Sequence, residues 1–292
     1  MAGNNHKGIL FSALLAVLSG SAGTASAASW TPPGVTMGLP LGSAFEPGLY
    51  VSNLTHYGTS PSKTVTADIP SLTWSPGWQL FGASYQASII AEGLEVWIKP
   101  STYKRDVFAP LLIPLSLSWN LGQGVFVSFS QGVYPGVATQ TSLSTPGRTS
   151  GTAFEERAAL SYLRDGWILS ANTISGVTTS DAAGLKQPNY FNIDWTAAHA
   201  FGRWKLGFVG YGAWDIEKTP ANATLGPGHT VAVGGLIGYD FGGATLNVEA
   251  THALVTGGNT NYGKYDTHVW ARVTIPVTGF MPAAAKQLIA TK

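Results

Sequence analysis

Cysteine is absent from the 292-residue sequence, which excludes a disulfide framework, a thiolate metal site and a lipidated N-terminal cysteine. Charged residues are scarce as well, at 11% of the chain. An average soluble protein has about 25%. Neither sign dominates, because 16 basic residues stand against 15 acidic ones. Without an excess of positive charge the chain lacks the electrostatic basis of nucleic-acid binding, so no nucleic-acid partner is expected.

Long apolar runs are also missing. The stretch from Ile9 to Leu18 is apolar but short, and a transmembrane helix needs about 20 residues. Lys7 precedes this stretch, and Ala25-Ser26-Ala27 follows it with the A-x-A pattern of a cleavage site. We therefore expect a secretory signal peptide at residues 1–27, export of the mature chain, and no transmembrane helix.

Glycine and aromatic residues are abundant, with 36 glycines and 11% aromatics. The stretch from Arg203 to Lys218 alternates: Trp204, Leu206, Phe208 and Trp214 share one face, and polar residues concentrate on the other. Such alternation predicts a strand with two differently solvated faces. The two tryptophans lie about 33 Å apart along a strand, or about 25 Å after the tilt of an outer-membrane barrel, which equals the height of its apolar band.

The same alternation recurs along the chain with turn residues between the segments. It predicts twelve strands, near 48–57, 64–74, 78–91, 107–119, 125–134, 154–164, 167–177, 190–200, 203–217, 229–241, 244–255 and 265–277. Every second connection is short and the others are longer. This pattern predicts an all-β fold, a transmembrane antiparallel up-and-down β-barrel over 48–277, with short periplasmic turns and longer extracellular loops.

Residue parity tests this prediction, because a two-residue turn must switch the outward face between even and odd numbers. Across Asp165-Gly166 the outward set passes from Leu160 to Leu169, as required. The connection Asn120 to Gly124, read as five residues, should preserve parity. Here the outward set is Ile113, Leu115, Leu117 and Trp119 before the turn, and Val125, Val127 and Phe129 after it. We expect an aromatic girdle that includes Trp119, Trp167, Trp204 and Trp214.

The opposite face is small and polar, and four charged residues are candidates for a site in the lumen: Arg157, Asp194, Glu249 and Arg272. If the last hairpin turns about residues 260 and 261, Glu249 lies directly opposite Arg272. Our hypothesis is a polar constriction that orients a permeant or locks a plug. Interior ion pairs that merely fill a narrow barrel are the alternative.

The flanks of the barrel are irregular. Residues 28–47 are predicted to be either a plug folded into the lumen or a disordered periplasmic leader, and residues 278–292 a periplasmic C-terminal tail. The five histidines that follow the predicted signal peptide show no metal-ligand spacing, and no catalytic pair of Ser and His can be named on the lipid-facing surface. No metal, cofactor or enzyme activity is expected.

Several segments resemble the phenol meta-pathway degradation family of outer-membrane proteins: GLYVSNLTHY (48–57), PSLTWSPGWQLFGASY (70–85), LIPLSLSWNLGQGVF (112–126), WKLGFVGYG (204–212) and VGGLIGYDFGG (233–243). The resemblance covers most of the mature chain, although Tyr134-Pro135-Gly136 departs from the Pro-Thr-Gly often seen there. It implies passage of small hydrophobic or aromatic solutes, with outer-membrane lipid and the barrel assembly machinery as partners. A structural or adhesion barrel, and a soluble secreted all-β binding domain, remain alternatives.

Overall fold

A computed structural model describes residues 29–61, 63–137, 151–181, 184, 186–219, 223, 226–258 and 266–277. The predicted signal peptide and the predicted C-terminal tail lie outside these residues. Within the described part, no helix is long and apolar enough to cross a membrane.

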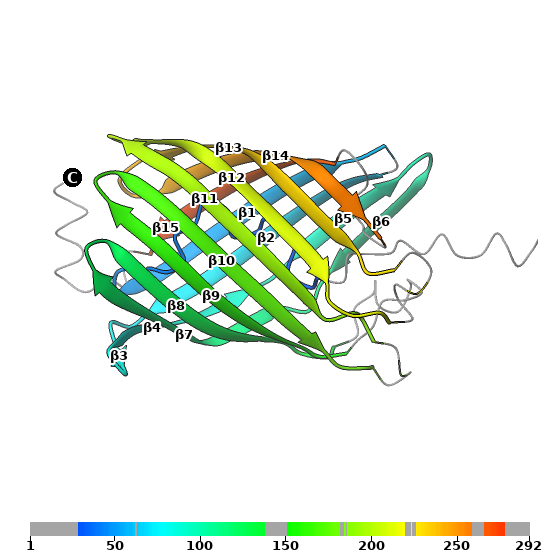
Figure 1. Ribbon diagram of the computed structural model, residues 1–292, viewed down its shortest axis with the longest axis horizontal. Helices are drawn as coiled ribbons and strands as arrows, with labels where there is room; N and C mark the ends of the chain where they lie inside the picture. Colours follow the sequence, from blue (N-terminus) through cyan, green and yellow to red (C-terminus); the bar gives the residue numbers. More distant parts are fainter. Residues whose placement is uncertain are drawn as a thin grey trace, which may run out of the picture.

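One antiparallel sheet forms the whole wall of the molecule (Figure 1). Its strands are β1 (Gly48–Thr59), β2 (Lys63–Ser75), β3 (Gln79–Leu80), β4 (Ala83–Ile90), β5 (Gly93–Ile98), β6 (Thr102–Val107), β7 (Leu111–Gly122), β8 (Val125–Tyr134), β9 (Ala153–Arg164), β10 (Trp167–Thr178), β11 (Tyr190–Phe201), β12 (Trp204–Asp215), β13 (His229–Asp240), β14 (Thr245–Gly257) and β15 (Thr267–Pro276). Each strand pairs with its neighbour, and β15 pairs with β1, so the sheet closes on itself.

The wall has twelve strands, because two pairs of segments each make one strand and the two-residue β3 pairs only with β4, at the tight turn that precedes it. β4 and β5 pair with β2 in a single register, from Trp74↔Ala87 to Lys63↔Ile98. β6 and β7 in turn pair with β5 and β4. The twelve-stranded antiparallel barrel predicted from the sequence is therefore confirmed. Two boundaries were wrong: the third predicted strand contains a tight turn at Phe81-Gly82, and the fourth begins at Thr102, so that β5 and β6 extend the wall as a long hairpin.

The connections fall into two classes. Short turns such as Asp165-Gly166, where both residues have positive φ (53° and 79°), gather at one end of the barrel, here named the turn end. β8, β10 and β12 end, and β9, β11 and β13 begin, at the opposite end of the barrel, here named the loop end. Paired positive φ values belong to type I′ turns, whose twist matches that of the adjoining strands. Such a turn has two residues between the paired strand ends, so the outward face switches between even and odd numbers across it.

Two irregularities in β7 correct the parity assignments. The connection after Trp119 is a two-residue turn at Gln123-Gly124, and a bulge at Leu121 precedes it. The turn switches parity and the extra residue of the bulge switches it back. Parity is therefore preserved, but not because the connection has five residues. A second register shift, between Leu112 and Leu115, reverses the faces upstream. Ile113 therefore points inward and is 6% exposed, although it was predicted to face outward. A bulge adds one residue to one strand only, and alternation cannot reveal it.

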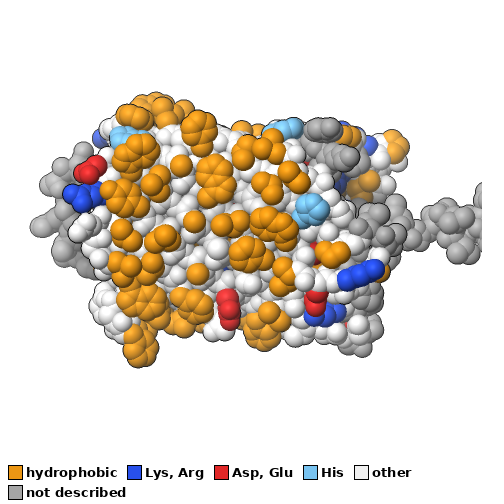
Figure 2. Space-filling view, in the orientation of Figure 1, with side chains coloured by type: hydrophobic (Ala, Val, Ile, Leu, Met, Phe, Trp, Pro, Cys, Tyr) orange, Lys and Arg blue, Asp and Glu red, His pale blue; other side chains and the backbone are white. Residues whose placement is uncertain are grey.

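The outer surface is apolar over most of its height. Leu206 is 47% exposed and Phe208 is 70% exposed on the outside of β12. In Figure 2 hydrophobic side chains cover much of the visible face, and most charged side chains lie toward its two ends. Of the predicted girdle, Trp119, Trp167 and Trp204 lie near the turn end, and Trp214 lies toward the loop end of the same barrel. An apolar band between aromatic rims suits a surface that faces lipid.

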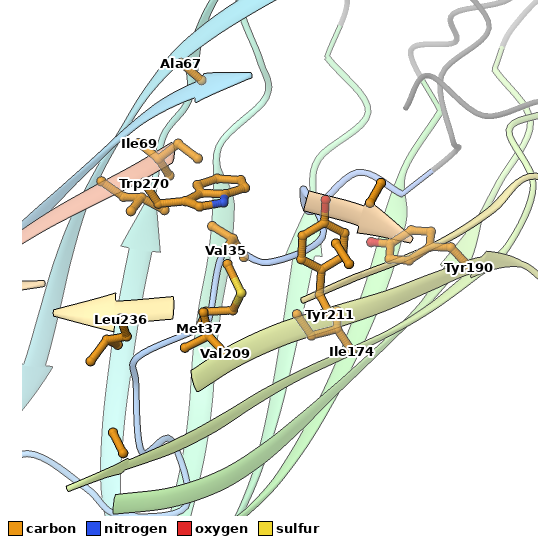
Figure 3. Packing of buried hydrophobic residues seen from close by; sticks show 14 residues of the cluster. Val35, Met37, Ala67, Ile69, Ile174, Tyr190, Val209, Tyr211, Leu236 and Trp270 are labelled. Atoms are coloured by element: carbon orange, nitrogen blue, oxygen red, sulfur yellow. The ribbon is translucent and has the colours of Figure 1, made fainter. Parts of the chain in front are cut away.

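The inside of the barrel is occupied by residues 29–47, here named the inner segment. Its Val35 and Met37 join a buried cluster with Val209, Leu236 and Trp270, which project from three different strands (Figure 3). Met37 is only 1% exposed. The barrel therefore has a packed core, and the chain preceding β1 supplies the middle of it.

The last hairpin is shifted from its expected register. Glu249 pairs with Trp270, and Arg272 pairs with Asn247, so the predicted direct opposition of Glu249 and Arg272 is wrong. The shift amounts to two residues, which keeps both side chains inside. Alternation fixes the face to which each residue belongs. It does not fix the register of β14 against β15, because a shift of two residues leaves every side chain on the same face.

The absence of cysteine makes this register directly testable. Val248 lies opposite Ala271, and paired residues have a separation of about 4.5–5.5 Å, within reach of a disulfide. Val248→Cys with Ala271→Cys should therefore cross-link on oxidation, which a shift in gel mobility would report. Ala250→Cys with Ala271→Cys is the matched control, because the register predicted from sequence would cross-link that pair instead.

The lipid-facing surface makes a second prediction. Phe208→Arg should destabilise the barrel by about 2–4 kcal/mol, since an arginine near the midplane loses hydration, whereas Phe201→Arg at the turn end should cost about 0–1 kcal/mol. Urea unfolding of the two variants in lipid vesicles measures both values. Equal costs would mean that Phe208 does not lie within the hydrocarbon.

Candidate functional site

The inner segment crosses the barrel from the loop end to the turn end. Near the loop end Thr31 Oγ1 lies 2.7 Å from the hydroxyl of Tyr134, the last residue of β8. Further on, Gly42 N donates to Ser161 Oγ at 3.0 Å, and β1 then starts at the turn end with Gly48. Successive i to i+3 backbone bonds, such as Met37 N to Gly34 O at 3.1 Å, coil the segment tightly.

Asp194 on β11 holds the middle of the inner segment. Its carboxylate accepts three hydrogen bonds: from Gly34 N at 2.9 Å, from Thr36 N at 2.9 Å and from Thr36 Oγ1 at 2.7 Å. Two residues along β11, Thr196 Oγ1 accepts from Gly38 N at 2.9 Å. Asp194 is fully buried, and bonds to an ionised acceptor are the stronger kind. The carboxylate is thereby held by backbone amides and a hydroxyl of the inner segment.

Two glycines let the segment approach the wall. Gly38 has a φ of 73°, and a Cβ there would lie 2.4 Å from Glu249 Oε1. At Gly42 a Cβ would lie 2.7 Å from the backbone oxygen of Phe126 and from the backbone nitrogen of Ser161. Side chains at these two positions would push the segment off its hydrogen-bonding partners.

Other wall residues bind the segment's carbonyl groups. Asn172 Nδ2 donates to Thr36 O at 3.1 Å and to Leu39 O at 3.2 Å, and Ser128 Oγ donates to Leu41 O at 2.7 Å. Arg272 Nη2 donates to Val35 O. The small polar side chains predicted to face the lumen thus meet the backbone of the inner segment.

A second group of polar side chains lies at the loop end, around Glu155 on β9. Arg157 Nη2 lies 2.6 Å from Glu155 Oε1 in an ion pair. The other carboxylate oxygen accepts from Tyr190 OH at 2.7 Å and from Thr31 Oγ1 at 2.5 Å. Glu155 is fully buried. Arg157 was a predicted lumen residue, and its nearest acid is its own strand neighbour rather than Asp194.

A cavity of about 250 Å³ remains between the inner segment and the part of the wall that it does not touch closely. Hydroxyl groups from adjacent strands bond to one another along this wall: Ser52 to Thr274 at 2.8 Å, Thr73 to Ser88 at 2.9 Å and Ser130 to Ser116 at 2.8 Å. The apolar part of the lining comes from Ile69, Ile90, Leu111 and Ile113. The lining thus combines apolar side chains and paired hydroxyls with a few strongly polar residues, among them Gln86, Glu92, Arg157 and Arg272.

The four predicted lumen residues all lie inside, but the structure does not bring them together as one constriction. Asp194 binds the inner segment, Arg157 pairs with Glu155, and Glu249 lies beneath Gly38. Arg157 and Arg272 reach the cavity. Sequence reasoning missed Glu155, although it shares the inward parity of Arg157 and could have been found from it.

Sequence reasoning also missed a pair of buried histidines. His56 Nε2 lies 2.7 Å from His268 Nδ1, and the His56 ring stacks on Trp270 with centroids 3.9 Å apart. The pair bridges β1 and β15, the strands that close the barrel. Their spacing of 212 residues leaves no local signal in the sequence.

Solved structures with a similar fold are outer-membrane barrels. The COG4313 outer membrane channel from Pseudomonas putida F1 aligns with a TM-score of 0.63 at 10% identity, covering 84% of this chain and 99% of that one. The NanC porin aligns at 0.49 with 12% identity, covering 78% and 100%. The translocator domain of the autotransporter NalP from Neisseria meningitidis aligns at 0.47 with 11% identity, covering 80% and 90%. At these identities the likeness concerns the fold.

Comparison by sequence is more specific. No curated protein matches the chain. The family described as "Putative MetA-pathway of phenol degradation" matches residues 51–273. This range includes all of β2 to β14 and most of β1 and β15. The resemblance noted from the sequence is thereby confirmed, and the chain belongs to the MetA-pathway of phenol degradation family.

Proposed function

We propose that the protein is an outer-membrane channel through which small hydrophobic or aromatic molecules diffuse. The observation that carries this proposal is the cavity between the inner segment and the wall. It lies inside a closed barrel whose outside is apolar, and a solute in it is therefore separated from lipid by one sheet. Insertion by the barrel assembly machinery into outer-membrane lipid is part of the same proposal.

The chemistry of the cavity favours a solute with an apolar body. An apolar cavity of about 150 Å³ holds benzene, so the larger space here has room for a single ring with substituents. Because the wall hydroxyls pair with one another, an apolar ring can lie against them without leaving a donor unsatisfied. The family's association with phenol degradation supports this solute class.

The inner segment acts in this proposal as a plug that narrows the lumen. Its contacts with the wall run almost entirely through side chains such as Asp194, Asn172 and Ser128, and none of its residues from 29 to 47 belongs to a strand of the sheet. Displacing it would leave the barrel's backbone ladder intact. A wider passage can therefore open without unfolding the wall.

Conductance recording in planar lipid bilayers tests both parts of the proposal. Purified wild-type protein should carry a small ion current that phenol interrupts, because phenol occupies the cavity. Asp194→Ala should raise the mean conductance severalfold, since it removes all three bonds that the carboxylate accepts from Gly34 and Thr36. Asp194→Asn keeps the volume of the side chain and should give an intermediate value.

Asp240→Asn is the matched control, because Asp240 bonds Gly242 in an exposed turn far from the inner segment, and it should leave the conductance unchanged. Heat-modifiable mobility on gels verifies that each variant forms the barrel. A current no larger than that of the bare bilayer, in wild type and in both Asp194 variants, would contradict the channel function.

A further inference from the structure

Arg272 on β15 differs from the other buried charges of the lumen. It is 8% exposed, yet no carboxylate among the described residues lies within ion-pair distance of its guanidinium. Nη2 donates to the neutral carbonyl of Val35, and Nε has no hydrogen-bond partner. A buried guanidinium with an unfilled donor is costly, because it has lost water without gaining a partner.

Two acids attract Arg272 electrostatically. Glu249 lies on the adjacent strand β14, where it pairs with Trp270, so it is a diagonal neighbour of Arg272. Asp194 is committed to the backbone of the inner segment. Neither of these two carboxylates lines the cavity, whereas Arg272 does.

The other charged groups of the cavity do not cancel this positive charge. Arg157 also reaches the cavity, but its charge is balanced by the ion pair with Glu155. Glu92 is the acid in the cavity lining, and it lies three strands from Arg272, which corresponds to about 14 Å at the usual strand spacing. Among the charged side chains that line the cavity, Arg272 therefore has no carboxylate beside it.

Strand register shows what surrounds the guanidinium. Leu54 pairs with both Arg272 and Ile69, so Arg272 and Ile69 lie in one row across β15, β1 and β2. The next inward row along the strands contains Thr274, Ser52 and Ser71, and continues to Ile90. Leu54 does not line the cavity, so the apolar part of the lining begins at Ile69, two strand spacings or about 10 Å from the strand of Arg272.

We propose that this part of the cavity is a binding site for the carboxylate of a single-ring aromatic acid. The carboxylate would accept hydrogen bonds from the guanidinium of Arg272, whose planar fork matches carboxylate geometry. The ring would lie over Ile69 and Ile90. The proposal rests on the proposed channel for aromatic solutes and adds that the lumen prefers the ionised acid over a neutral ring of the same shape.

Benzoate and benzamide test the preference, because the two are nearly isosteric and differ in charge. Binding of each to the purified full-length protein in detergent can be measured by titration calorimetry near neutral pH. Wild type should bind benzoate at least about tenfold more tightly than benzamide, the factor expected for hydrogen bonds between charged partners. Arg272→Gln should abolish the preference while leaving benzamide binding unchanged.

Two further variants control the result. Arg272→Lys keeps the charge but loses the fork, so it should retain part of the preference and serves if Arg272→Gln fails to assemble. Arg164→Gln removes an exposed arginine that pairs with Asp165 at the turn end, and should change nothing. Equal binding of the two compounds to wild type, binding of neither, or a preference that survives in Arg272→Gln would overturn the site. Failure of the channel itself is read separately, from the conductance recordings.

Discussion

The fold depends on one constraint: backbone N–H and C=O groups that face lipid have no water to bond with, so each must be paired within the sheet. Pairing of β15 with β1 meets this constraint by removing both free edges. Closure then divides every strand into a face toward lipid and a face toward the lumen. The alternation of large apolar and small polar residues along the chain follows from that division, and so does the location of aromatic residues at the rims.

Closure also creates an interior that the wall cannot fill. Inward side chains on most strands are small, among them Ser118, Ser128 and Ser161. The inner segment occupies this space by bringing apolar residues such as Met37 and by presenting its backbone to wall hydroxyls, amides and Asp194. The segment and the wall are complementary in a specific sense: each supplies the hydrogen-bonding groups that the other leaves unsatisfied. Where the two surfaces separate, the cavity remains.

The sequence predicted those features that depend on periodicity. Strand number, the lipid-facing side of β12 and the inward direction of Arg157, Asp194, Glu249 and Arg272 all follow from alternation at period two, which a closed barrel imposes everywhere. Bulges escape this reasoning. One extra residue in β7 turned Ile113 into the lumen, and no local pattern marks such an insertion.

Pairings between distant residues could not be predicted from the sequence for a different reason. The register of β14 against β15 depends on the path of a long connection, and a shift of two residues changes partners without changing faces. The bonds between Asp194 and the inner segment join residues about 160 positions apart, and the fit depends on close contact at Gly38 and Gly42. The charge of Asp194 indicated a partner inside the barrel. The three-dimensional fold identifies that partner as the backbone amides of Gly34 and Thr36 in the inner segment.

The way in which the inner segment is attached has a consequence for the energetics of the molecule. Strands of the wall share a continuous ladder, so they are expected to lose structure together. The segment shares none of that ladder, and its attachment consists of separate side-chain contacts. Wall and segment are thus two cooperative units within one chain, with different free energies of opening. Hydrogen exchange should therefore divide the protein into a slowly exchanging cylinder and a faster insert. In the proposed channel, the local stability of the insert then sets how often the lumen is clear.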